Sequence, residues 1–381
     1  MGNDLPARKP LLRALTDLCG PGYARLARRS DAVCGRHAAF VAAPPTTGAV
    51  VVALRLAAER GLSVSPRGSG SKIDWCCPGF GADLILDTHR LDGIHRVDPA
   101  DPTATVVAEV GVGMPVRSLG AALAPHGLRL AVDPPSPTAT VGGMLALNET
   151  GPLRHRFGTA AGQVESVTYA TGSGDHVGAG PLDAAGVIVS ARVRLEPLPA
   201  ARRWVVAPVT APRDIHDLVQ ETLAQQVRPS AVEIDLPVGP APAALAVLIE
   251  GDPREVAERT TRLQQALHAG AESTAEAPSW WGRYPFGPTD VALRIAVPPE
   301  ELQAAVFALR DVAGAPVPVR GAAGRGIVHA ALPGSVGPER AEGILDAVRG
   351  VLLARGGRCV AIAAPPHLGA ALHLANRRDL F

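Results

Sequence analysis

A glycine-rich segment, Arg67-Gly-Ser-Gly-Ser-Lys72, offers two cations and several backbone N–H groups to an anionic ligand. Its two glycines allow a turn in which N–H groups point inward, a nest that suits a diphosphate. The segment has neither the third glycine of a Rossmann fingerprint nor the spacing of a P-loop. By itself it is as typical of a glycine-rich hairpin as of a phosphate-binding loop.

Two further segments have residue types that suit an anionic or flat ligand. Asp133-Pro-Pro-Ser-Pro-Thr-Ala-Thr-Val-Gly-Gly143 combines three prolines with a glycine pair that lets a ligand approach the backbone closely. Gly151-Pro-Leu-Arg-His-Arg-Phe-Gly158 adds two arginines and a histidine, and arginine is the usual partner of anionic groups. Taken singly, the first also fits a proline-stiffened surface turn and the second a solvated basic turn.

Short helices and strands must position these segments. Thr46 or Thr47 can cap a helix over 50–60, Gly61 suits its C-terminal end, and Pro115 can open a helix over 116–124 that ends at Gly127. Apolar runs predict the strands of this half of the chain at 62–65, 82–87, 104–110, 166–170 and 187–195.

The second half of the chain has a different order of elements, which begins after a proline-containing linker at 196–203. Strands, S, and helices, H, are predicted at 204–209 (S), 213–226 (H), 231–236 (S), 244–250 (S), 253–268 (H), 291–297 (S), 299–311 (H), 316–319 (S), 326–332 (S), 338–354 (H) and 358–363 (S). The later set forms a complete β-α-β-β-α-β unit and the earlier set nearly does. Two ferredoxin-like halves would build one antiparallel sheet with helices on one face.

Composition excludes several classes of function. The net charge of +1 and the 3% aromatic content give no support to nucleic-acid binding. The eleven histidines are dispersed, and no His/Asp/Glu cluster has metal-ligand spacing, so no metal site is expected. The five cysteines imply neither a disulfide framework nor a zinc site, and the Cys76–Cys77 pair is interpreted as structural, not as a redox switch. No apolar run is long enough to span a bilayer and no signal region is seen, so a cytoplasmic protein is expected.

Together, the glycine-containing segments resemble a known family. Pro66-Arg-Gly-x-Gly-Ser, then Pro-x-x-Thr-Val-Gly-Gly, Asn-x-x-Gly and Arg-Phe-Gly are similar to the FAD-linked oxidases with a p-cresol methylhydroxylase-type domain, in particular the small FAD-binding subunits of bacterial glycolate oxidases. Asp31–Gly35, Trp280–Phe286 and Arg325–Ala331 are similar too, so the resemblance runs from about 31 to 380.

The resemblance implies an α+β fold and a set of site residues. A helical segment (1–39), an FAD-binding domain of two α+β subdomains (40–200) and a ferredoxin-like-repeat cap domain (201–381) would follow one another. The resemblance assigns the cofactor to Arg67, Gly68, Ser69, Gly70, Ser71, Lys72, Pro134, Pro135, Thr138, Thr140, Val141, Gly142, Gly143, Asn148, Gly151, Arg156, Gly158, Val187 and Ile188. The cap domain would shape the substrate pocket, with Arg283 and Tyr284 as carboxylate contacts, whereas Trp280 and Trp281 are interpreted as core residues.

The implied activity is oxidation of a small 2-hydroxy acid or similar alcohol by hydride transfer to FAD. The FAD would be non-covalent, because the first loop lacks the histidine to which some relatives attach their flavin. A larger FAD subunit and an iron–sulfur subunit would be partners.

Four departures from the family pattern favour an alternative, a non-catalytic binding or assembly subunit. They are Ala161-Gly162 in place of an Arg-Asp pair, Thr171–Gly174 in place of an Ala-Asp-Gly hairpin, a shortened stretch at 178–186, and an end at Arg378–Phe381 where relatives continue.

Overall fold

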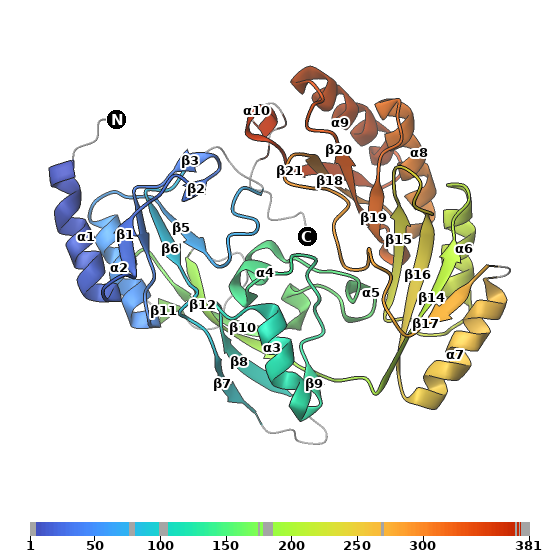
Figure 1. Ribbon diagram of the computed structural model, residues 1–381, viewed down its shortest axis with the longest axis horizontal. Helices are drawn as coiled ribbons and strands as arrows, with labels where there is room; N and C mark the ends of the chain where they lie inside the picture. Colours follow the sequence, from blue (N-terminus) through green and yellow to red (C-terminus); the bar gives the residue numbers. More distant parts are fainter. Residues whose placement is uncertain are drawn as a thin grey trace.

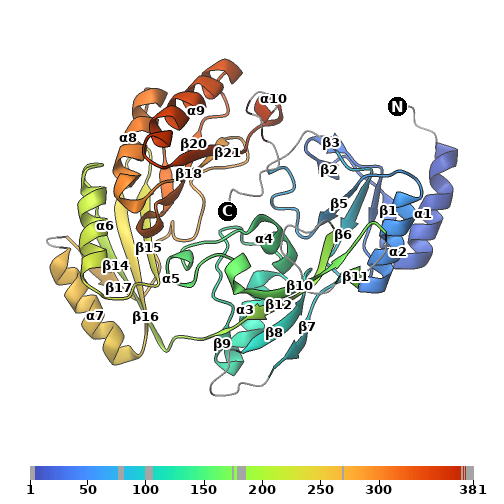
Figure 2. The same ribbon diagram turned by 180° about the vertical axis from the view of Figure 1, so that it is seen from behind.

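The computed structural model describes residues 5–75, 81–98, 106–173, 176–177, 186–267, 270–369, 372 and 374. Three sheets carry the architecture, and the largest of them is built entirely from the second half of the chain. Figures 1 and 2 show this large sheet and its helices as one layered unit beside the two smaller sheets.

The first sheet has four strands in the order β1-β4-β6-β5, with β4, β6 and β5 parallel to one another. Two helices, α1 and α2, pack on it through Leu15, Val50 and Leu54. Thr46 caps α2 by accepting a hydrogen bond from the Ala49 N–H at 3.2 Å. The elements of this part are α1 (Leu5–Cys19), β1 (Ala24–Leu26), β2 (Ala32–Val33), β3 (Arg36–His37), β4 (Phe40–Ala42), α2 (Thr47–Ala58), β5 (Val64–Arg67) and β6 (Leu84–Asp87).

The second sheet is antiparallel, with five strands in the order β11-β10-β12-β8-β7. Helices α3 and α4 bury Leu119, Leu123, Met144 and Leu145 against it. Its elements are β7 (Ile94–Val97), β8 (Val107–Gly111), α3 (Val116–Leu123), η1 (Ala124–His126), α4 (Val141–Leu147), α5 (Arg154–Phe157), η2 (Ala161–Gln163), β10 (Val164–Ala170), β11 (His176–Val177) and β12 (Val187–Arg194), beside the small pair β9 (Leu128–Arg129) and β13 (Glu196–Pro197).

The third sheet has eight antiparallel strands in the order β17-β14-β16-β15-β19-β20-β18-β21. Each half of this order is a ferredoxin-like unit, and the halves join where β15 pairs with β19. Its elements are β14 (Ala201–Pro208), α6 (Asp214–Ala224), β15 (Ala231–Leu236), β16 (Ala244–Gly251), α7 (Pro253–Ala266), β17 (Glu272–Thr274), β18 (Val291–Ala296), η3 (Pro299–Glu301), α8 (Leu302–Ala313), β19 (Val319–Ala322), η4 (Ala323–Arg325), β20 (Ile327–Leu332), α9 (Pro338–Leu353), β21 (Arg358–Ala363) and α10 (Pro366–Gly369).

The four long helices α6 to α9 cover one face of this sheet, and the other face is turned toward the first half of the chain (Figure 1). The period of two in the strands explains this. In β20, Val328, Ala330 and Leu332 join the core under the helices, so His329 points to the opposite face. The functional side chains of this half are therefore those at alternate positions of the central strands.

The fold class is as predicted, α+β with a ferredoxin-like repeat, but two local expectations were wrong. Strand β14 begins at Ala201, inside the segment predicted as a linker. The prediction missed this start because Arg202 and Arg203 are exposed and interrupt the apolar pattern of the strand. The short strand β17 completes the first ferredoxin-like unit and has only three residues, too few for a pattern. The division of the chain at 40 and 201 stays a prediction.

The cysteines also differ from expectation. Cys34 is disulfide-bonded, whereas Cys19 and Cys359 are free and buried. Cysteine spacing along the chain does not show which thiols the fold brings together, so this bond could not be predicted. Cys76 and Cys77 lie outside the described residues. No helix among the described residues is long and apolar enough to cross a membrane.

Candidate functional site

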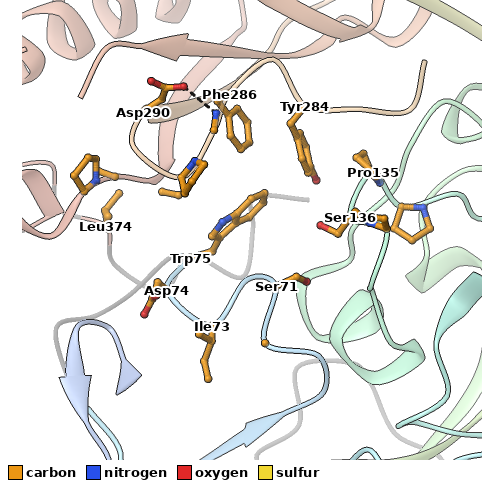
Figure 3. A pocket seen from close by; sticks show the side chains of 18 of the residues that line it. Ser71, Ile73, Asp74, Trp75, Pro135, Ser136, Tyr284, Phe286, Asp290 and Leu374 are labelled. Atoms are coloured by element: carbon orange, nitrogen blue, oxygen red, sulfur yellow. Dashed lines mark hydrogen bonds between the residues drawn. The ribbon is translucent and has the colours of Figure 1, made fainter. Parts of the chain in front are cut away.

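A cavity of about 1430 Å³ lies where the predicted ligand loops meet the large sheet. Its walls come from 70–75 and 134–137 on one side and from 281–290 and 363–366 on the other. Figure 3 shows Ser71, Ser136 and Pro135 along one side of the cavity, and Tyr284 and Phe286 along the other. The cavity is larger than the 300–1,000 Å³ typical of small-molecule sites, so it has room for a dinucleotide-sized ligand.

Three aromatic rings, contributed by both sides of this cavity, meet to form an aromatic wall. Trp75 follows the first glycine-rich loop and points toward Tyr284 and Phe286 (Figure 3). The ring centroids of Trp75 lie 5.3 Å from Tyr284 and 5.7 Å from Phe286, and Tyr284 stacks on Phe286 at 4.7 Å. Such a wall offers π faces and edges to a flat ring system. Neither Trp75 nor Phe286 was predicted as a site residue.

Three exposed arginines, Arg36, Arg117 and Arg283, also line the cavity. Within the part of the chain that the structure describes, none of them has an ion-pair partner. Their charges are therefore available to an anionic ligand, because a guanidinium pairs with phosphate or carboxylate through its fork of N–H donors. Arg283 was predicted here; Arg36 and Arg117 were not.

A recess of about 40 Å³ adjoins the cavity and shares Pro135, Gly282, Arg283 and Tyr284 with it. This volume is about three times what one water molecule needs, so it fits a group the size of a carboxylate. Both halves of the chain line the recess, so a ligand bound there would contact both. The first half contributes Arg154 and the large sheet contributes Glu233, Arg294, Arg320 and His329.

A polar row crosses the sheet floor of this recess. Asp235, Arg320, His329 and Arg294 are successive cross-strand partners on β15, β19, β20 and β18. Direct cross-strand partners lie on the same face of a sheet, so the four side chains share the face opposite the helices. Arg320 donates to Asp235 at 2.8 Å. A single charged residue within an otherwise apolar strand, as in Val291–Ala296, is the sequence signal that could have revealed this row.

Burial sets the protonation states in the recess. Desolvation lowers the pKa of His329 to about 3, with Arg294 and Arg154 adding to the effect, so its imidazole is neutral at pH 7. Desolvation also raises the pKa of the Glu233 carboxyl well above its usual range. His329 Nε2 and Glu233 Oε1 are buried and have no hydrogen-bond partner among the described residues. The recess therefore combines excess positive charge with two polar atoms that a ligand could satisfy.

The two predicted cofactor loops touch each other directly. A Cβ atom at Gly68 would lie 2.1 Å from Thr140 Oγ1, so only glycine allows this approach. Of the predicted cofactor residues, Gly70, Ser71, Pro134 and Pro135 line the large cavity and Gly151 lines the recess. The structure thus brings the tips of the two loops to one site.

The two cations of the first loop are held by carboxylates. Arg67 forms ion pairs with Asp31 at 2.9 Å and Asp87 at 2.8 Å. Lys72 Nζ lies 2.5 Å from Glu149 Oε2 and donates to Ser136 Oγ at 2.8 Å. The sequence alone does not show these contacts, because the carboxylate partners lie 20 to 77 residues from Arg67 or Lys72 along the chain.

Other predicted cofactor residues serve the local fold. Thr140 caps α4 through the Gly143 N–H, and a Cβ at Gly142 would lie 2.9 Å from Val112 Cβ. Asn148 ends α4 with a positive φ of 50° and accepts a hydrogen bond from the Ala161 N–H.

The remaining predicted residues lie away from the two pockets described above. They are the exposed Ser69 and Thr138, the buried Val141 and Val187, the half-buried Ile188, Gly158 at the end of α5, and Arg156, which lines a separate cleft beside Phe157. Trp281 contacts the buried Trp204 edge-to-face at 6.0 Å.

The cavity fits an FAD cofactor on three observations. Its volume suits a dinucleotide, its aromatic wall suits a flat ring, and its arginines without ion-pair partners suit a diphosphate. Gly70, with a positive φ of 77°, lets the first loop approach such a ligand without a side chain in the way.

Comparison with known proteins decides the assignment. Residues 38–180 match the family model for an FAD binding domain. The chain carries an FAD-binding domain of the p-cresol methylhydroxylase type. It is 33% identical over 122 residues to an uncharacterized FAD-linked oxidoreductase of Mycobacterium tuberculosis, covering 32% of this chain and 26% of that protein. It thus spans about a quarter of that relative's length.

Two further proteins extend the similarity beyond the FAD-binding domain. Glycolate oxidase subunit GlcD of Bacillus subtilis is 25% identical over 324 residues, with 72% of this chain and 67% of that protein covered. A solved alkyldihydroxyacetonephosphate synthase shares the fold, with a TM-score of 0.70, 16% identity, and coverage of 92% of this chain and 80% of that chain. The chain therefore shares the fold of that synthase over most of its length.

Two predicted departures, the shortened stretch at 178–186 and the end at Arg378–Phe381, fall outside the described residues except for Gly186. The other two are visible. Ala161 and Gly162 form the short η2 helix, where Gly162 donates to Thr159 Oγ1, and Thr171 contacts Ser173 in the turn after β10.

Proposed function

We propose that this chain is an FAD-dependent oxidoreductase that oxidises a small 2-hydroxy acid or a similar alcohol, with its flavin held non-covalently in the large cavity. The observation that carries the proposal is the recess beside Tyr284, where arginines from both halves of the chain surround a neutral histidine. The name of the GlcD relative, a glycolate oxidase subunit, supports the same class of substrate.

The recess suits the carboxylate of such a substrate. Arg154 and Arg294 line the recess, and their guanidinium groups can donate charge-assisted hydrogen bonds to that carboxylate. His329 Nε2, in the tautomer that leaves it unprotonated, can accept a hydrogen bond from the substrate hydroxyl. These two contacts orient the carbon that bears the hydroxyl toward the cavity.

The cofactor would be held by the loop tips Gly70–Ser71 and Pro134–Pro137 and by Arg36, Arg117 and Arg283. When bound, FAD supplies a hydride acceptor for the carbon that bears the hydroxyl. The aromatic wall of Trp75, Tyr284 and Phe286 would present apolar ring surfaces to the flavin.

The test begins with the absorbance spectrum of the purified protein and of the protein incubated with FAD. The flavin-loaded protein is then mixed without oxygen with glycolate, D-lactate or L-lactate, and we expect at least one of them to bleach the flavin band. Arg154→Gln should raise the KM for that acid about tenfold to a hundredfold, since a charge-assisted hydrogen bond contributes about 1.5–3 kcal/mol. Arg213→Gln, a control whose side chain is 82% exposed, should leave it unchanged. A loaded protein that none of the acids bleaches would refute the proposal.

One observation favours the alternative, a non-catalytic binding or assembly subunit. Both cations of the first loop are held by carboxylates of the chain itself, through Asp31, Asp87 and Glu149. The alternative predicts a colourless protein that does not recover flavin absorbance on incubation with FAD.

We also propose a larger FAD subunit and an iron–sulfur subunit as partners, because the GlcD relative is itself named as a subunit. Affinity purification of the tagged chain from its own cells, followed by mass spectrometry, should recover both. Recovery of the chain alone at native expression would contradict this.

A further inference from the structure

Lys72 stands out in the composition of this chain. The sequence has only two lysines, Lys9 and Lys72, against 35 arginines. The two residue types differ in shape, because lysine presents a compact charge with three rotatable donors whereas arginine presents a rigid planar fork. Lys72 is the last residue of the first cofactor loop, whereas Lys9 lies in α1.

Three oxygen atoms of the protein lie close to the Lys72 ammonium group. Nζ lies 2.5 Å from Glu149 Oε2, 2.8 Å from Ser136 Oγ and 3.3 Å from Ser71 Oγ. The side chain is only 5% exposed. An ammonium group has three N–H donors, of which two go to the serine hydroxyls, and its charge is paired with Glu149 and not with a phosphate.

Glu149 links this lysine to two other parts of the site. Its Oε1 atom accepts hydrogen bonds from Ser136 Oγ at 2.9 Å and from Tyr284 Oη at 2.8 Å. Its side chain is 1% exposed, so its charge is removed from water. One carboxylate thereby joins the first loop, the second loop and the cap.

We infer that Lys72 and Glu149 are positioning residues, an internal ion pair that sets the spacing of the two FAD-binding loops and docks the cap on them, in place of a direct contact between Lys72 and the diphosphate. The ion pair and its two hydroxyl partners are defined here as the loop clasp (Lys72, Glu149, Ser136 and Tyr284). This inference rests on FAD binding at the cavity and adds a role for Lys72 and Glu149, which do not line it.

The loop clasp predicts a pattern of FAD affinities among variants that would not arise if Lys72 bound the phosphate directly. Removing either charge leaves the other buried and unpaired, which is strongly unfavourable, whereas removing both leaves no unpaired charge. Lys72→Met and Glu149→Gln should each raise the Kd for FAD about tenfold or more, and the double variant should return to within about threefold of the wild type. Lys9→Met, which changes the other lysine, is the matched control and should bind FAD as the wild type does.

The experiment has two readouts. The first is the Kd for FAD, measured by quenching of flavin fluorescence. The second uses protein without FAD: an amine-selective acetylating reagent is applied, and mass spectrometry follows modification of Lys72 against Lys9. In the wild type Lys9 should react while Lys72 is protected, and Glu149→Gln should remove the protection.

Two results would overturn the clasp. One is a Lys72→Met variant that loses FAD while Glu149→Gln binds it normally and the double variant stays weak, which is the pattern of a direct phosphate ligand. The other is a Lys72 that reacts as fast as Lys9 in the wild type. If the wild type binds no FAD, the proposed function fails, but the labelling of Lys72 still decides whether the clasp exists.

Discussion

The contact between the FAD-binding domain and the large sheet depends on a buried ion pair that can be tested directly. Arg129 on β9 donates from both terminal nitrogens to the two carboxylate oxygens of Glu250 on β16, each at 2.8 Å. The side chains are 10% and 2% exposed. Glu250 also lies 3.1 Å from the half-exposed Arg202, which can compensate for part of a lost partner.

The variant Arg129→Met keeps an apolar side chain but removes the charge. Breaking a buried pair costs about 3–5 kcal/mol, and an exposed partner such as Arg202 returns about 0.2–1 kcal/mol of that. We therefore expect the free energy of unfolding to fall by about 2–4 kcal/mol at pH 7. The assay is equilibrium urea unfolding of the wild type, Arg129→Met, Glu250→Leu and the double variant, in which the double variant should recover much of the loss.

The pH dependence gives a second check on the same pair. Burial raises the pKa of the Glu250 carboxyl, but hydrogen bonding and charge from Arg129 outweigh this effect and hold the pKa below its ordinary 4.5. A carboxylate with a lowered folded-state pKa adds stability above the unfolded pKa and loses it as the pH falls through the folded pKa. The difference between wild type and Arg129→Met should therefore be full at pH 7 and shrink below pH 4.5. A loss under about 1 kcal/mol, or one that does not change with pH, would refute the reasoning.

Three further predictions concern the two loops and helix α2. Gly68→Ala should weaken FAD binding about tenfold or more, measured by flavin fluorescence, because its Cβ would lie 2.1 Å from Thr140 Oγ1 and force the loops apart. Burial raises the pKa of Asp133 from 3.8 to about 7, so folding loses stability as the pH rises through that window; Asp133→Asn should flatten thermal stability between about pH 4 and 7. Thr46→Ala removes the cap on the Ala49 N–H and should cost about 1 kcal/mol in urea unfolding.

The sequence predicted the elements well because their signals are local. Thr46 caps α2 and Pro115 precedes α3 at the positions expected, and Gly127 ends the following turn with a positive φ of 68°. The order of strands and helices after residue 200 was enough to predict two ferredoxin-like halves, since that fold follows from connection order and handedness.

The site was predicted less completely because its contacts are not local. Lys72 and Glu149 are 77 residues apart and Tyr284 is 135 residues beyond Glu149, so no window of sequence shows that they meet. A glycine-rich loop with two cations reads as a phosphate site whether or not carboxylates elsewhere hold those cations. Trp75 gives no pattern at all, since a single tryptophan after a loop is as consistent with core packing as with a cavity wall.

The polar row of the large sheet connects the fold to the proposed chemistry. Charged and polar side chains within buried strands are costly unless they have partners. Arg320 has Asp235, but among the described residues His329 Nε2 and Glu233 Oε1 have none. The proposed 2-hydroxy acid would bring a carboxylate to the arginine-lined recess and a hydroxyl to His329 Nε2. The central strands of the large sheet thus place these two polar atoms beside the cavity. Substrate binding would supply hydrogen bonds that offset the free-energy cost of burying them.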